Sequence, residues 1–420
     1  MKKRVLVLNC GTLASTDINM SLRHNEEFEI WGASTNKNHG IYVYEKYIED
    51  IPNISDPDFI NILNKKIKEY DFKFVLAPHE DLALFLQENK DKINACIVCS
   101  NYDTSLLCRY KSRTYEKMKE YDFIPKVYKK EEVKEFPVFC KKDTDQGGRH
   151  AYKIENKDEL ELYAKDDMII CEYLPGEEVT IDCFTDKNRN LLYCNPRAAD
   201  RMLAGIDVHA RRIELTDEIK YIAESLNKEI EFRGYWFFQI KKAADGKFKL
   251  LEIATRLAGS FALNKALDVN LPLIALKDFD GQDVEIVFNN LNVEADKQFF
   301  TKFILDLEYE NVYIDFESCF EKSKILNTLF MMYIYQCINN KKKIILFSES
   351  EEKSLKYLKQ NKISIDIFDK IINFDSLKQE INNKSIFISN NDKMKNSLRK
   401  EKDIYCFSTN SIEALIDWKA

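Results

Sequence analysis

The residues best suited to chemistry lie near the middle of the chain, where an apolar run ends in a lysine. Residues 136–141 read Phe-Pro-Val-Phe-Cys-Lys, and a glycine-containing segment follows at residues 143–150. A lysine that leaves a strand beside glycines, which let backbone N–H groups come close, can hold phosphate groups. A hairpin with a surface lysine has the same pattern, so this segment alone does not decide between the two interpretations.

A second candidate is the acidic turn that follows the apolar run at residues 168–171. A Pro-Gly pair at residues 175–176 separates this run from another strand-like segment. Backbone groups of such a linker can face the edge of an adenine ring, and the Glu178 carboxylate can accept hydrogen bonds from ribose hydroxyls. An acidic turn between two strands is the alternative interpretation.

Two polar residues, Gln239 and Glu252, interrupt apolar runs on either side of a hairpin signal. A buried carboxylate needs a cation or an arginine as its partner. Oxygen ligands of this kind suit Mg²⁺, which bridges nucleotide phosphates and keeps several water ligands. Arg256 lies four residues after Glu252, where it can meet an anion. An ion pair between Glu252 and Arg256 at a strand end is the alternative.

A fourth candidate is the segment at residues 195–205, which reads Asn-Pro-Arg-Ala-Ala-Asp-Arg-Met-Leu-Ala-Gly. We interpret it as a basic loop in an acidic chain. Arg201 in this loop can stabilise negative charge that develops on a phosphoryl or acyl-phosphate group. A solvated surface loop without a role in catalysis has the same composition.

The elements that must position these residues fall into three regions. Residues 1–104 alternate between strand-like and helix-like segments, which predicts an α/β domain built on a parallel sheet. Residues 105–296 contain short strands, hairpin turns and few helices, which predicts an α+β domain. Strands and helices alternate again in residues 297–420. The predicted fold class is therefore multi-domain α/β and α+β, with a Rossmann-like domain at each end.

Taken in order, these motifs resemble the ATP-grasp superfamily, and most of all its carboxylate–amine ligases related to the large subunit of carbamoyl-phosphate synthetase. The resemblance covers the chain from its start to about residue 294. It implies that residues 1–104 are the domain that precedes the grasp and that residues 105–296 are the ATP-grasp domain. It also implies ATP and Mg²⁺ as cofactors, small-molecule carboxylate and amine substrates, and a homodimer as one oligomeric option.

The resemblance assigns roles residue by residue. The nucleotide contacts that it implies are Lys111 and Lys141 at the phosphates, Gln146, Gly147, Gly148, Arg149 and His150 in a lid over the triphosphate, Glu172, Tyr173 and Leu174 at the adenine, and Glu178 at the ribose. Gln239 and Glu252 match its Mg²⁺ ligands. Arg256 matches an arginine that holds phosphate or substrate, and Arg201 lies in its arginine loop, so both are expected to be catalytic.

The chain departs from the family pattern at one metal position. The common ending Glu-Ile-Asn-Pro-Arg is Glu-Ile-Ala-Thr-Arg here, with Ala254 in place of the asparagine ligand. Both one and two Mg²⁺ ions are compatible with this sequence. Residues 78–81, Pro-His-Glu-Asp, match the acidic loop that faces the acceptor site in the family. A helix N-terminus rich in carboxylates is the alternative interpretation.

The C-terminal region, residues 297–420, resembles the haloacid dehalogenase-like hydrolases. Three residues match functional groups of that family: Asp315 the nucleophile, Ser348 the phosphate-binding hydroxyl and Lys378 the phosphate-binding lysine. Glu317 stands where a second aspartate is usual, and Ser389 or Asn390 stands where a metal-binding aspartate is usual. An active phosphatase and a structural or regulatory domain are both compatible with this altered pattern.

These resemblances imply an ATP-dependent ligase that joins a carboxylate to an amine through an acyl phosphate, acting on a small metabolite or a sugar acid. Three alternatives stay open. One is an ATP-dependent small-molecule kinase on the same scaffold, and another is a phosphatase with a decayed ATP-grasp region. The third is a nucleotide sensor without catalytic activity.

The amino-acid composition limits which binding partners and which cellular compartment are expected. The 420 residues include 63 basic and 70 acidic side chains, for a net charge of −7. Nucleic-acid binding is not expected, because it needs a surplus of basic groups. The longest apolar runs are too short to span a bilayer, so no membrane partner is expected. Eleven cysteines without an export signal are expected to be reduced thiols, which predicts a cytoplasmic location.

Overall fold

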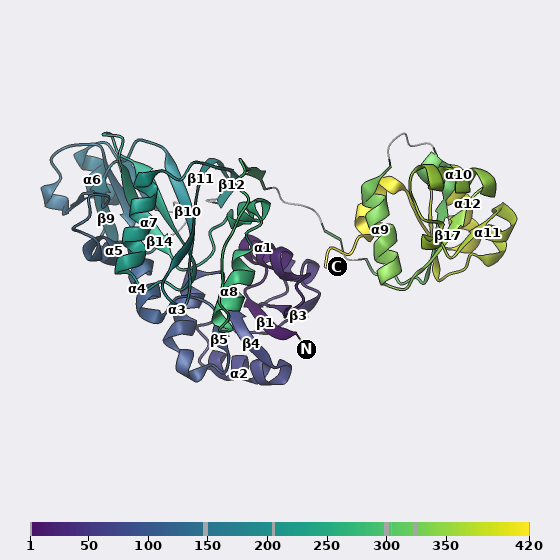
Figure 1. The fold of residues 1–420 in the computed structure, drawn as a ribbon, viewed down its shortest axis with the longest axis horizontal. Helices are drawn as coiled ribbons and strands as arrows, with labels where there is room; N and C mark the ends of the chain where they lie inside the picture. The colour runs from purple at the N-terminus through teal and green to yellow at the C-terminus, as the bar shows by residue number, and fades with distance from the viewer. Residues whose placement is uncertain are drawn as a thin grey trace. The chain divides into compact units, whose positions relative to one another are not determined.

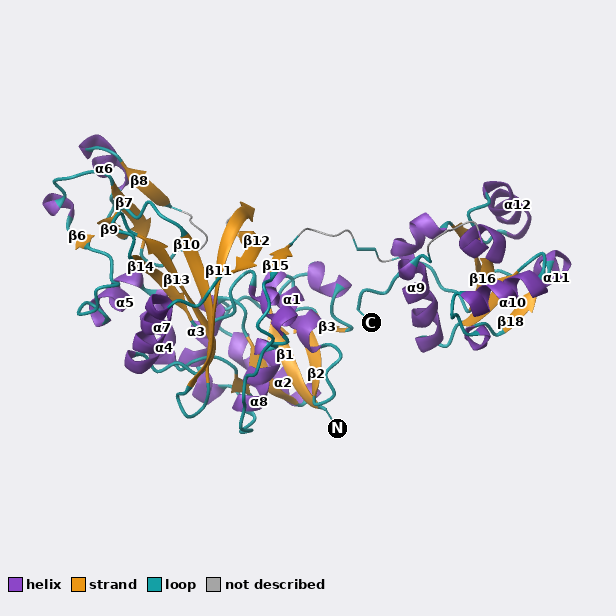
Figure 2. Cartoon of the chain, turned by 45° about the horizontal axis from the view of Figure 1, so that its top comes forward, coloured by secondary structure: helices purple, strands orange, loops and turns teal. Residues whose placement is uncertain are grey.

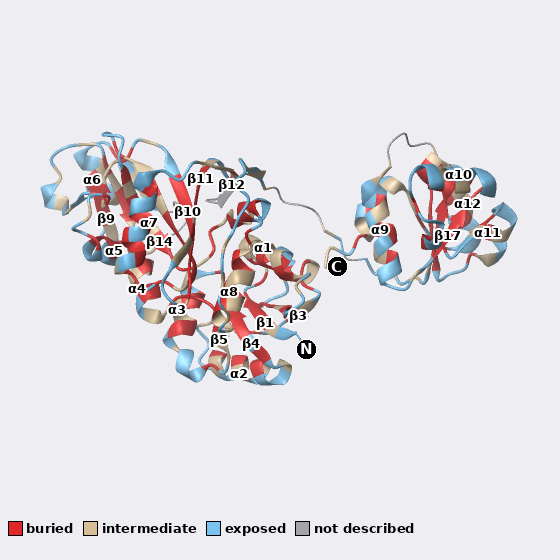
Figure 3. Ribbon diagram, in the orientation of Figure 1, coloured by how far each residue is buried: buried red, intermediate tan, exposed pale blue. Residues whose placement is uncertain are grey.

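The computed structural model divides the chain into two compact units, residues 1–299 and residues 300–420 (Figure 1). The structure describes residues 2–145, 150–203, 206–297, 302–303, 305–321 and 326–419. Strands form the interior of each unit with helices around them (Figure 2), and the strands are largely buried (Figure 3). No helix within the described part of the chain has the length and apolar character that a bilayer-spanning segment requires.

The N-terminal unit begins with a five-stranded parallel sheet in the order β3-β2-β1-β4-β5. Its strands are β1 (Lys3–Leu8), β2 (Phe28–Ala33), β3 (Lys46–Ile48), β4 (Phe72–Leu76) and β5 (Cys96–Ile97). Its helices are α1 (Leu13–Leu22), α2 (Phe59–Tyr70) and α3 (Glu80–Glu88). The parallel α/β arrangement that the alternating sequence predicts is therefore confirmed.

Both faces of this sheet are buried. Along β1, Val5 and Val7 pack in one apolar cluster with α1, while Leu6 and Leu8 pack in another with α2 and α3. A central parallel strand lies between two layers of helices, so its apolar residues form a continuous run and do not alternate with polar ones. This explains why residues 5–8 are all apolar.

The second sheet of the N-terminal unit has six antiparallel strands in the order β14-β13-β10-β11-β12-β15. They are β10 (Glu178–Thr185), β11 (Leu191–Leu203), β12 (Ile206–Arg212), β13 (Gly234–Lys242), β14 (Phe248–Ala254) and β15 (Glu294–Asp296). On one face Ile181 and Phe238 pack against α7 (Asp217–Glu229). Side chains alternate along a strand, so the polar residues Thr180 and Gln239 lie on the opposite face.

A third, smaller sheet is antiparallel and has the order β6-β9-β7-β8. Its strands are β6 (Val127–Tyr128), β7 (Val138–Lys142), β8 (Ala151–Ile154) and β9 (Met168–Glu172), and α6 (Lys157–Tyr163) packs on it. The remaining helices of the unit are α4 (Tyr102–Arg109), α5 (Lys111–Lys117) and α8 (Leu271–Phe279). Helix α8 shares an apolar cluster with α1, which joins the two ends of this unit.

The expected basic loop at residues 195–205 is wrong for most of its length, because strand β11 runs to Leu203. In its ladder with β10, Asn195 lies opposite Asp182 and Arg197 lies opposite Thr180. Arg197 is buried, and its Nε lies 3.1 Å from Asp182 Oδ2. The paired carboxylate makes burial of this guanidinium tolerable. A run of polar residues therefore forms a central strand instead of a solvated loop.

The C-terminal unit contains a five-stranded parallel sheet in the order β18-β17-β16-β19-β20. Its strands are β16 (Asn311–Asp315), β17 (Lys343–Phe347), β18 (Lys370–Ile372), β19 (Ser385–Ile388) and β20 (Tyr405–Phe407). Its helices are α9 (Thr328–Asn339), α10 (Glu351–Gln360), α11 (Phe374–Glu380) and α12 (Asp392–Lys402). Two apolar clusters, one on each face of β16, make the core of this unit.

The alternating residues 363–368 predict a strand in this unit, but the strand begins only at Lys370. Residues 365–367 form a short 3₁₀ turn, and the Ser364 side chain accepts a hydrogen bond from the backbone N–H of Asp366. Local capping by serine competes with strand pairing here. The prediction of a strand at residues 363–368 is therefore wrong, because the strand lies further along the chain, at Lys370–Ile372.

Candidate active site

The candidate active site lies where helix α5 and the small sheet meet the end of β14. Lys111 is the first residue of α5, and its Nζ lies 3.1 Å from Glu252 Oε2. The same Nζ donates a hydrogen bond of 2.8 Å to the carbonyl oxygen of Asp145. The two charged side chains are only 9% and 18% exposed, so each ion neutralises the other in a largely dry environment.

Lys141 reaches the same strand from β7. Its Nζ donates to the hydroxyl of Tyr115 at 2.8 Å and to the carbonyl oxygen of Leu251 at 3.0 Å. No carboxylate pairs with it among the residues that the structure describes. The ammonium is buried with uncharged partners, so it is a favourable site for an anion.

Four polar residues form one row across neighbouring strands of the large sheet. Glu252 lies opposite Gln239, Gln239 opposite Thr180, and Thr180 opposite Arg197. Gln239 Nε2 donates to Thr180 Oγ1 at 3.1 Å. Directly opposite residues share one face of a sheet, so the row makes a continuous polar track beside the two lysines. The structure thus brings Gln239 and Glu252 together.

The donor set at Gln239 and Glu252 fits Mg²⁺. It offers one carboxylate and one amide oxygen, and no group of three or more His, Cys, Asp or Glu side chains suited to a metal occurs in the described part of the chain. Mg²⁺ is commonly bound through few protein ligands, with water and phosphate oxygens completing the shell. Ala254 packs in an apolar cluster with Phe237 and Ala258, so this position adds no ligand.

Arg256 has a different partner from the one that its spacing suggests. Its Nε lies 3.0 Å from Glu80 Oε1, and Arg109 Nη1 lies 3.5 Å from Glu80 Oε2. Arg109 also pairs with Asp81 at 2.7 Å. The alternative of a local Glu252–Arg256 pair is therefore wrong, because the guanidinium pairs with Glu80 while Glu252 pairs with Lys111. Nothing in the sequence around Arg109 marks it, since it is one arginine in the last turn of α4.

The acidic segment at residues 78–81 forms a helix N-terminus, which is one of the two interpretations of its sequence. Glu80 and Asp81 occupy the first turn of α3, where carboxylates favour the positive end of the helix dipole. They also face Arg109 and Arg256, so they contribute to the candidate site. They follow the carboxyl end of β4, the edge of a parallel sheet at which ligands commonly bind in α/β folds, and the acceptor-site interpretation stays a prediction.

The residues assigned to adenine and ribose line the connection between β9 and β10. Glu172 Oε1 accepts a hydrogen bond of 2.8 Å from the backbone N–H of Lys126, and Leu174 is buried. The Tyr173 ring lies 4.8 Å from Lys153 Nζ. Glu178 is exposed at the start of β10 and accepts from Gln239 Nε2 at 3.4 Å, which places it beside the middle of the polar row.

The predicted lid falls largely outside the described residues, which exclude Gln146, Gly147, Gly148 and Arg149. His150, the last residue of the predicted lid, is described, and its Nδ1 lies 2.5 Å from Asp145 Oδ2. The hydrogen bond from His150 lowers the pKa of Asp145. Asp145 also offers its backbone carbonyl to Lys111, so the residue before the lid is tied to a phosphate-site lysine.

Arg201 is not brought together with the other predicted residues. It lies near the end of β11, is 52% exposed and pairs with Asp296 of β15. Arg197, four residues earlier on the same strand, lies in the polar row instead. The sequence pattern indicated Arg201 and not Arg197. Arg197 can be buried only because Asp182 of the neighbouring strand pairs with it, and the local sequence does not show this contact.

The predicted residues of the C-terminal unit are only partly clustered. Asp315 and Ser348 lie at the carboxyl ends of the adjacent strands β16 and β17, and Ser348 donates to Glu317 Oε1 at 2.8 Å. Asp315 Oδ2 accepts from Ser389 Oγ at 2.5 Å. Lys378 lies in α11, is 45% exposed and pairs with Glu401 at 3.5 Å.

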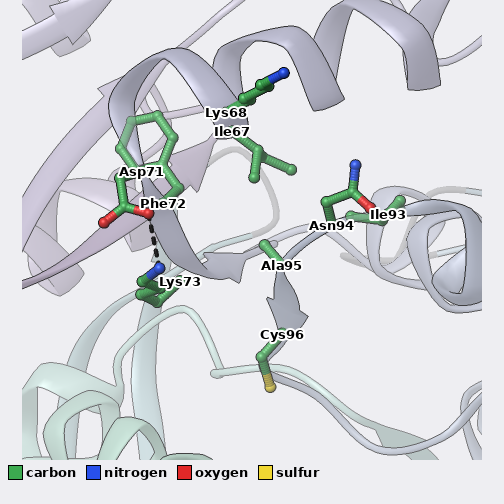
Figure 4. Close-up of a pocket in the computed structure, with 9 residues that line it drawn as sticks. All are labelled: Ile67, Lys68, Asp71, Phe72, Lys73, Ile93, Asn94, Ala95 and Cys96. Carbon is green, nitrogen blue, oxygen red and sulfur yellow. Dashed lines mark hydrogen bonds and ion pairs between the residues drawn. The ribbon is translucent and has the colours of Figure 1, made fainter.

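A hollow of about 590 Å³ lies elsewhere on the N-terminal unit (Figure 4). It is lined by residues at the amino ends of β4 and β5, including Phe72 and Cys96, and by Asp71, which pairs with Lys73 at 2.7 Å. Ligands in parallel α/β sheets bind at the carboxyl ends of strands. This hollow is therefore distinct from the candidate site near Glu80.

Comparison with known proteins agrees with the nucleotide interpretation of this geometry. Residues 164–299 match a protein family described as an ATP-grasp in the biosynthetic pathway with Ter operon. No curated protein matches the sequence.

Solved structures share the fold at low sequence identity. The biotin carboxylase domain of 2-oxoglutarate carboxylase from Hydrogenobacter thermophilus, determined with MgADP, ADP and bicarbonate, has 16% identity and a TM-score of 0.57, and the match covers 68% of this chain and 71% of that one. N5-carboxyaminoimidazole synthetase from Staphylococcus aureus with ADP has 15% identity and a TM-score of 0.57. This match covers 69% of this chain and 80% of that one. L-amino acid ligase from Bacillus licheniformis has 13% identity and a TM-score of 0.53. This match covers 66% of this chain and 74% of that one. The TM-scores of 0.53 to 0.57 show that the chain shares the fold of these enzymes.

Proposed function

We propose that this protein is an ATP- and Mg²⁺-dependent ligase that joins a carboxylate to an amine through an acyl phosphate. The observation that carries the proposal is the convergence of Lys111 and Lys141, from different elements, on consecutive residues of β14. Two cations next to the Glu252 carboxylate suit a metal-bound polyphosphate, because each charge of the ligand then has a counter-charge.

The residues that would hold the nucleotide follow from this placement. Lys111 and Lys141 would contact phosphate oxygens, and Gln239 and Glu252 would hold Mg²⁺, which supplies neutralisation of phosphate charge when it is bound. Lys111 would exchange its pairing with Glu252 for a phosphate oxygen, and the Glu252 carboxylate would then be balanced by Mg²⁺. Glu172, Tyr173, Leu174 and Glu178 would contact the nucleoside.

We assign the acceptor site to a group of four charged side chains. These are Glu80 and Asp81 of α3, Arg109 of α4, and Arg256, which follows the end of β14. Arg256 would hold the carboxylate substrate, and Glu80 with Asp81 would attract the protonated amine. In the assembled site a carboxylate oxygen of the substrate would attack the γ-phosphorus of ATP, and ADP would leave. The ammonium would then give a proton to Glu80 or Asp81, and the neutral amine would displace phosphate from the acyl carbon. Exclusion of water protects the acyl phosphate from hydrolysis. The solved neighbours that are carboxylases, synthetases and ligases support this class of reaction.

The proposal is tested by the acceptor dependence of ADP release. A thermal-shift screen of the full chain with ATP–Mg²⁺ and a panel of amino acids and sugar acids first identifies ligands, because binding raises the apparent stability. We expect ADP release only when one carboxylate and one amine are both present. Release with a single acceptor and a stable phosphate ester would show a kinase instead, and nucleotide binding without turnover would show a sensor.

For the C-terminal unit we propose a structural or regulatory role. Both carboxylate oxygens of Asp315 already accept hydrogen bonds, Oδ1 from the Ser318 N–H at 3.3 Å and Oδ2 from the hydroxyls of Ser318 and Ser389 at 2.7 and 2.5 Å. A nucleophilic carboxylate needs an oxygen that is free to meet the phosphorus atom. Hydrolysis of p-nitrophenyl phosphate that disappears in Asp315→Asn would contradict this role and favour a haloacid dehalogenase-like phosphatase.

A further inference from the structure

Tyr115 holds the ammonium of Lys141 without belonging to any motif described so far. Its hydroxyl oxygen lies 2.8 Å from Lys141 Nζ, and its ring centroid lies 5.4 Å from the same atom. Tyr115 is buried, with 3% of its surface exposed. Because the ammonium lies 2.8 Å from the hydroxyl oxygen but 5.4 Å from the ring centroid, it lies beyond the hydroxyl at the edge of the ring, and the contact is made through the phenol oxygen.

The hydroxyl of Tyr115 has a fixed orientation. It donates its single proton to the carbonyl oxygen of Leu251 at 2.7 Å, so its lone pair is left for Lys141. Lys141 Nζ also donates to that carbonyl at 3.0 Å. Burial raises the pKa of Tyr115 well above its ordinary value, so the phenol keeps its proton at neutral pH. The three groups form a closed triangle in which each hydrogen bond restrains the other two.

Helix α5 relates this triangle to the other lysine of the site. Tyr115 lies four residues after Lys111 on α5, so both side chains lie on the same face of the helix. Lys111 meets Glu252, and Tyr115 meets the preceding residue, Leu251, on β14. One helical turn therefore docks against two consecutive residues of β14 and sets the positions of both ammonium groups.

We propose that Tyr115 is a positioning residue that presents the Lys141 ammonium to the phosphates of a bound nucleotide. This inference rests on the proposed function. Without the hydroxyl, Lys141 keeps only the Leu251 carbonyl as a partner, and the direction of its charge is less well defined. Phosphate binding weakens, while contacts to the nucleoside at Glu172–Glu178 are unaffected.

The test compares the binding of Mg²⁺–ADP and of adenosine to the full chain by isothermal titration calorimetry. In Tyr115→Phe we expect the dissociation constant for ADP to rise about tenfold, the order that a hydrogen bond to a charged group contributes. The dissociation constant for adenosine should not change, because adenosine has no phosphates. The control is Tyr235→Phe, which removes another buried hydroxyl of the same unit, one that donates to the Val98 carbonyl at 3.2 Å. This control should change neither constant.

A second comparison tests whether Tyr115 affects ADP binding through Lys141. In a Lys141→Met background, adding Tyr115→Phe should weaken ADP binding no further, because the two residues act as one unit. Equal ADP affinity in the wild type and Tyr115→Phe, or an additional loss in the double variant, would overturn the inference. A Tyr115→Phe protein that fails to fold, or that loses ADP and adenosine binding in parallel, would show a merely structural role. A wild-type chain that does not bind ADP would overturn the proposed function as well.

Discussion

Single residues at the candidate site neutralise one another in pairs. Lys111 pairs with Glu252, Arg256 with Glu80, and Arg109 with Asp81. Each pair contains a cation suited to phosphate or carboxylate and an anion suited to a metal or an amine. A ligand that carries both signs of charge can replace these pairings without leaving a buried charge alone. Lys141 differs because its described partners are uncharged.

Substitution of Glu252 tests this pairing of charges at the scale of single residues. We expect Glu252→Gln to lower ATP turnover by about a hundredfold or more, because the amide lacks the charge that binds Mg²⁺ and balances Lys111. The fold should persist, since Lys111 keeps its hydrogen bond to Asp145. Steady-state ADP release measures the first effect, and circular dichroism measures the second. Glu116→Gln is the matched control on α5, because Glu116 is 73% exposed and pairs with Lys119. Full activity of Glu252→Gln would reject the metal assignment.

The elements that carry the site are held by charges as well as by apolar packing. In the parallel sheet, Glu29 of β2 lies between Arg4 of β1 at 2.9 Å and Lys46 of β3 at 2.7 Å. Trp31 Nε1 also donates to Glu29 at 3.0 Å. Burial raises the pKa of Glu29, but the hydrogen bonds from Lys46, Trp31 and Arg4 outweigh it and bring the pKa to about 2. One carboxylate therefore links three neighbouring strands.

The pH dependence of stability tests this link at the element scale. Because the pKa of Glu29 is lower in the folded state, its stabilisation is complete above the ordinary value of 4.5 and is lost as the pH falls towards about 2. We expect Glu29→Gln to lower the free energy of unfolding by about 1 kcal/mol at pH 7, since its partners are partly exposed. Urea unfolding should show this difference shrinking between pH 4.5 and about 2. Glu45→Gln, at an exposed position beside Lys46, should show no such trend. A difference that does not depend on pH would contradict the assignment.

The whole molecule consists of two units whose apolar cores are separate. Within the described residues, each core cluster takes its side chains from one unit only. All the residues proposed to bind nucleotide belong to the N-terminal unit, residues 1–299. A unit with its own core can fold without the rest of the chain.

Truncation tests this independence at the scale of the molecule. We expect a fragment of residues 1–299 to fold and to bind Mg²⁺–ADP within about threefold of the full chain, because its cores and its site are complete. Calorimetric titration of both proteins makes the comparison, with Lys141→Ala in each background as the control for weakened binding. Loss of ADP binding in the folded fragment would instead place part of the nucleotide site in residues 300–420.

The sequence by itself determined the features that depend on local patterns. Alternation of apolar segments predicted the parallel sheets of both units, because strand and helix periods are set by near neighbours. The hairpin between Gln239 and Glu252 brought these two residues into register across adjacent strands. Resemblance of the ordered motifs added Lys111 and Lys141, and the structure places both at the same strand end.

Only the tertiary structure decided which charges meet. The hydrogen bond from Arg256 to Glu80 joins residues 176 positions apart, and that from Tyr115 to Leu251 joins residues 136 positions apart. No sequence period extends over such separations, so Arg109 and Tyr115 carry no local signal of their contacts. The strand at Arg197 was missed for the same reason, because its burial is tolerable only beside Asp182 of another strand. Packing between elements decides these partners, since a buried charge needs a counter-charge or hydrogen-bonding groups that the fold brings to it.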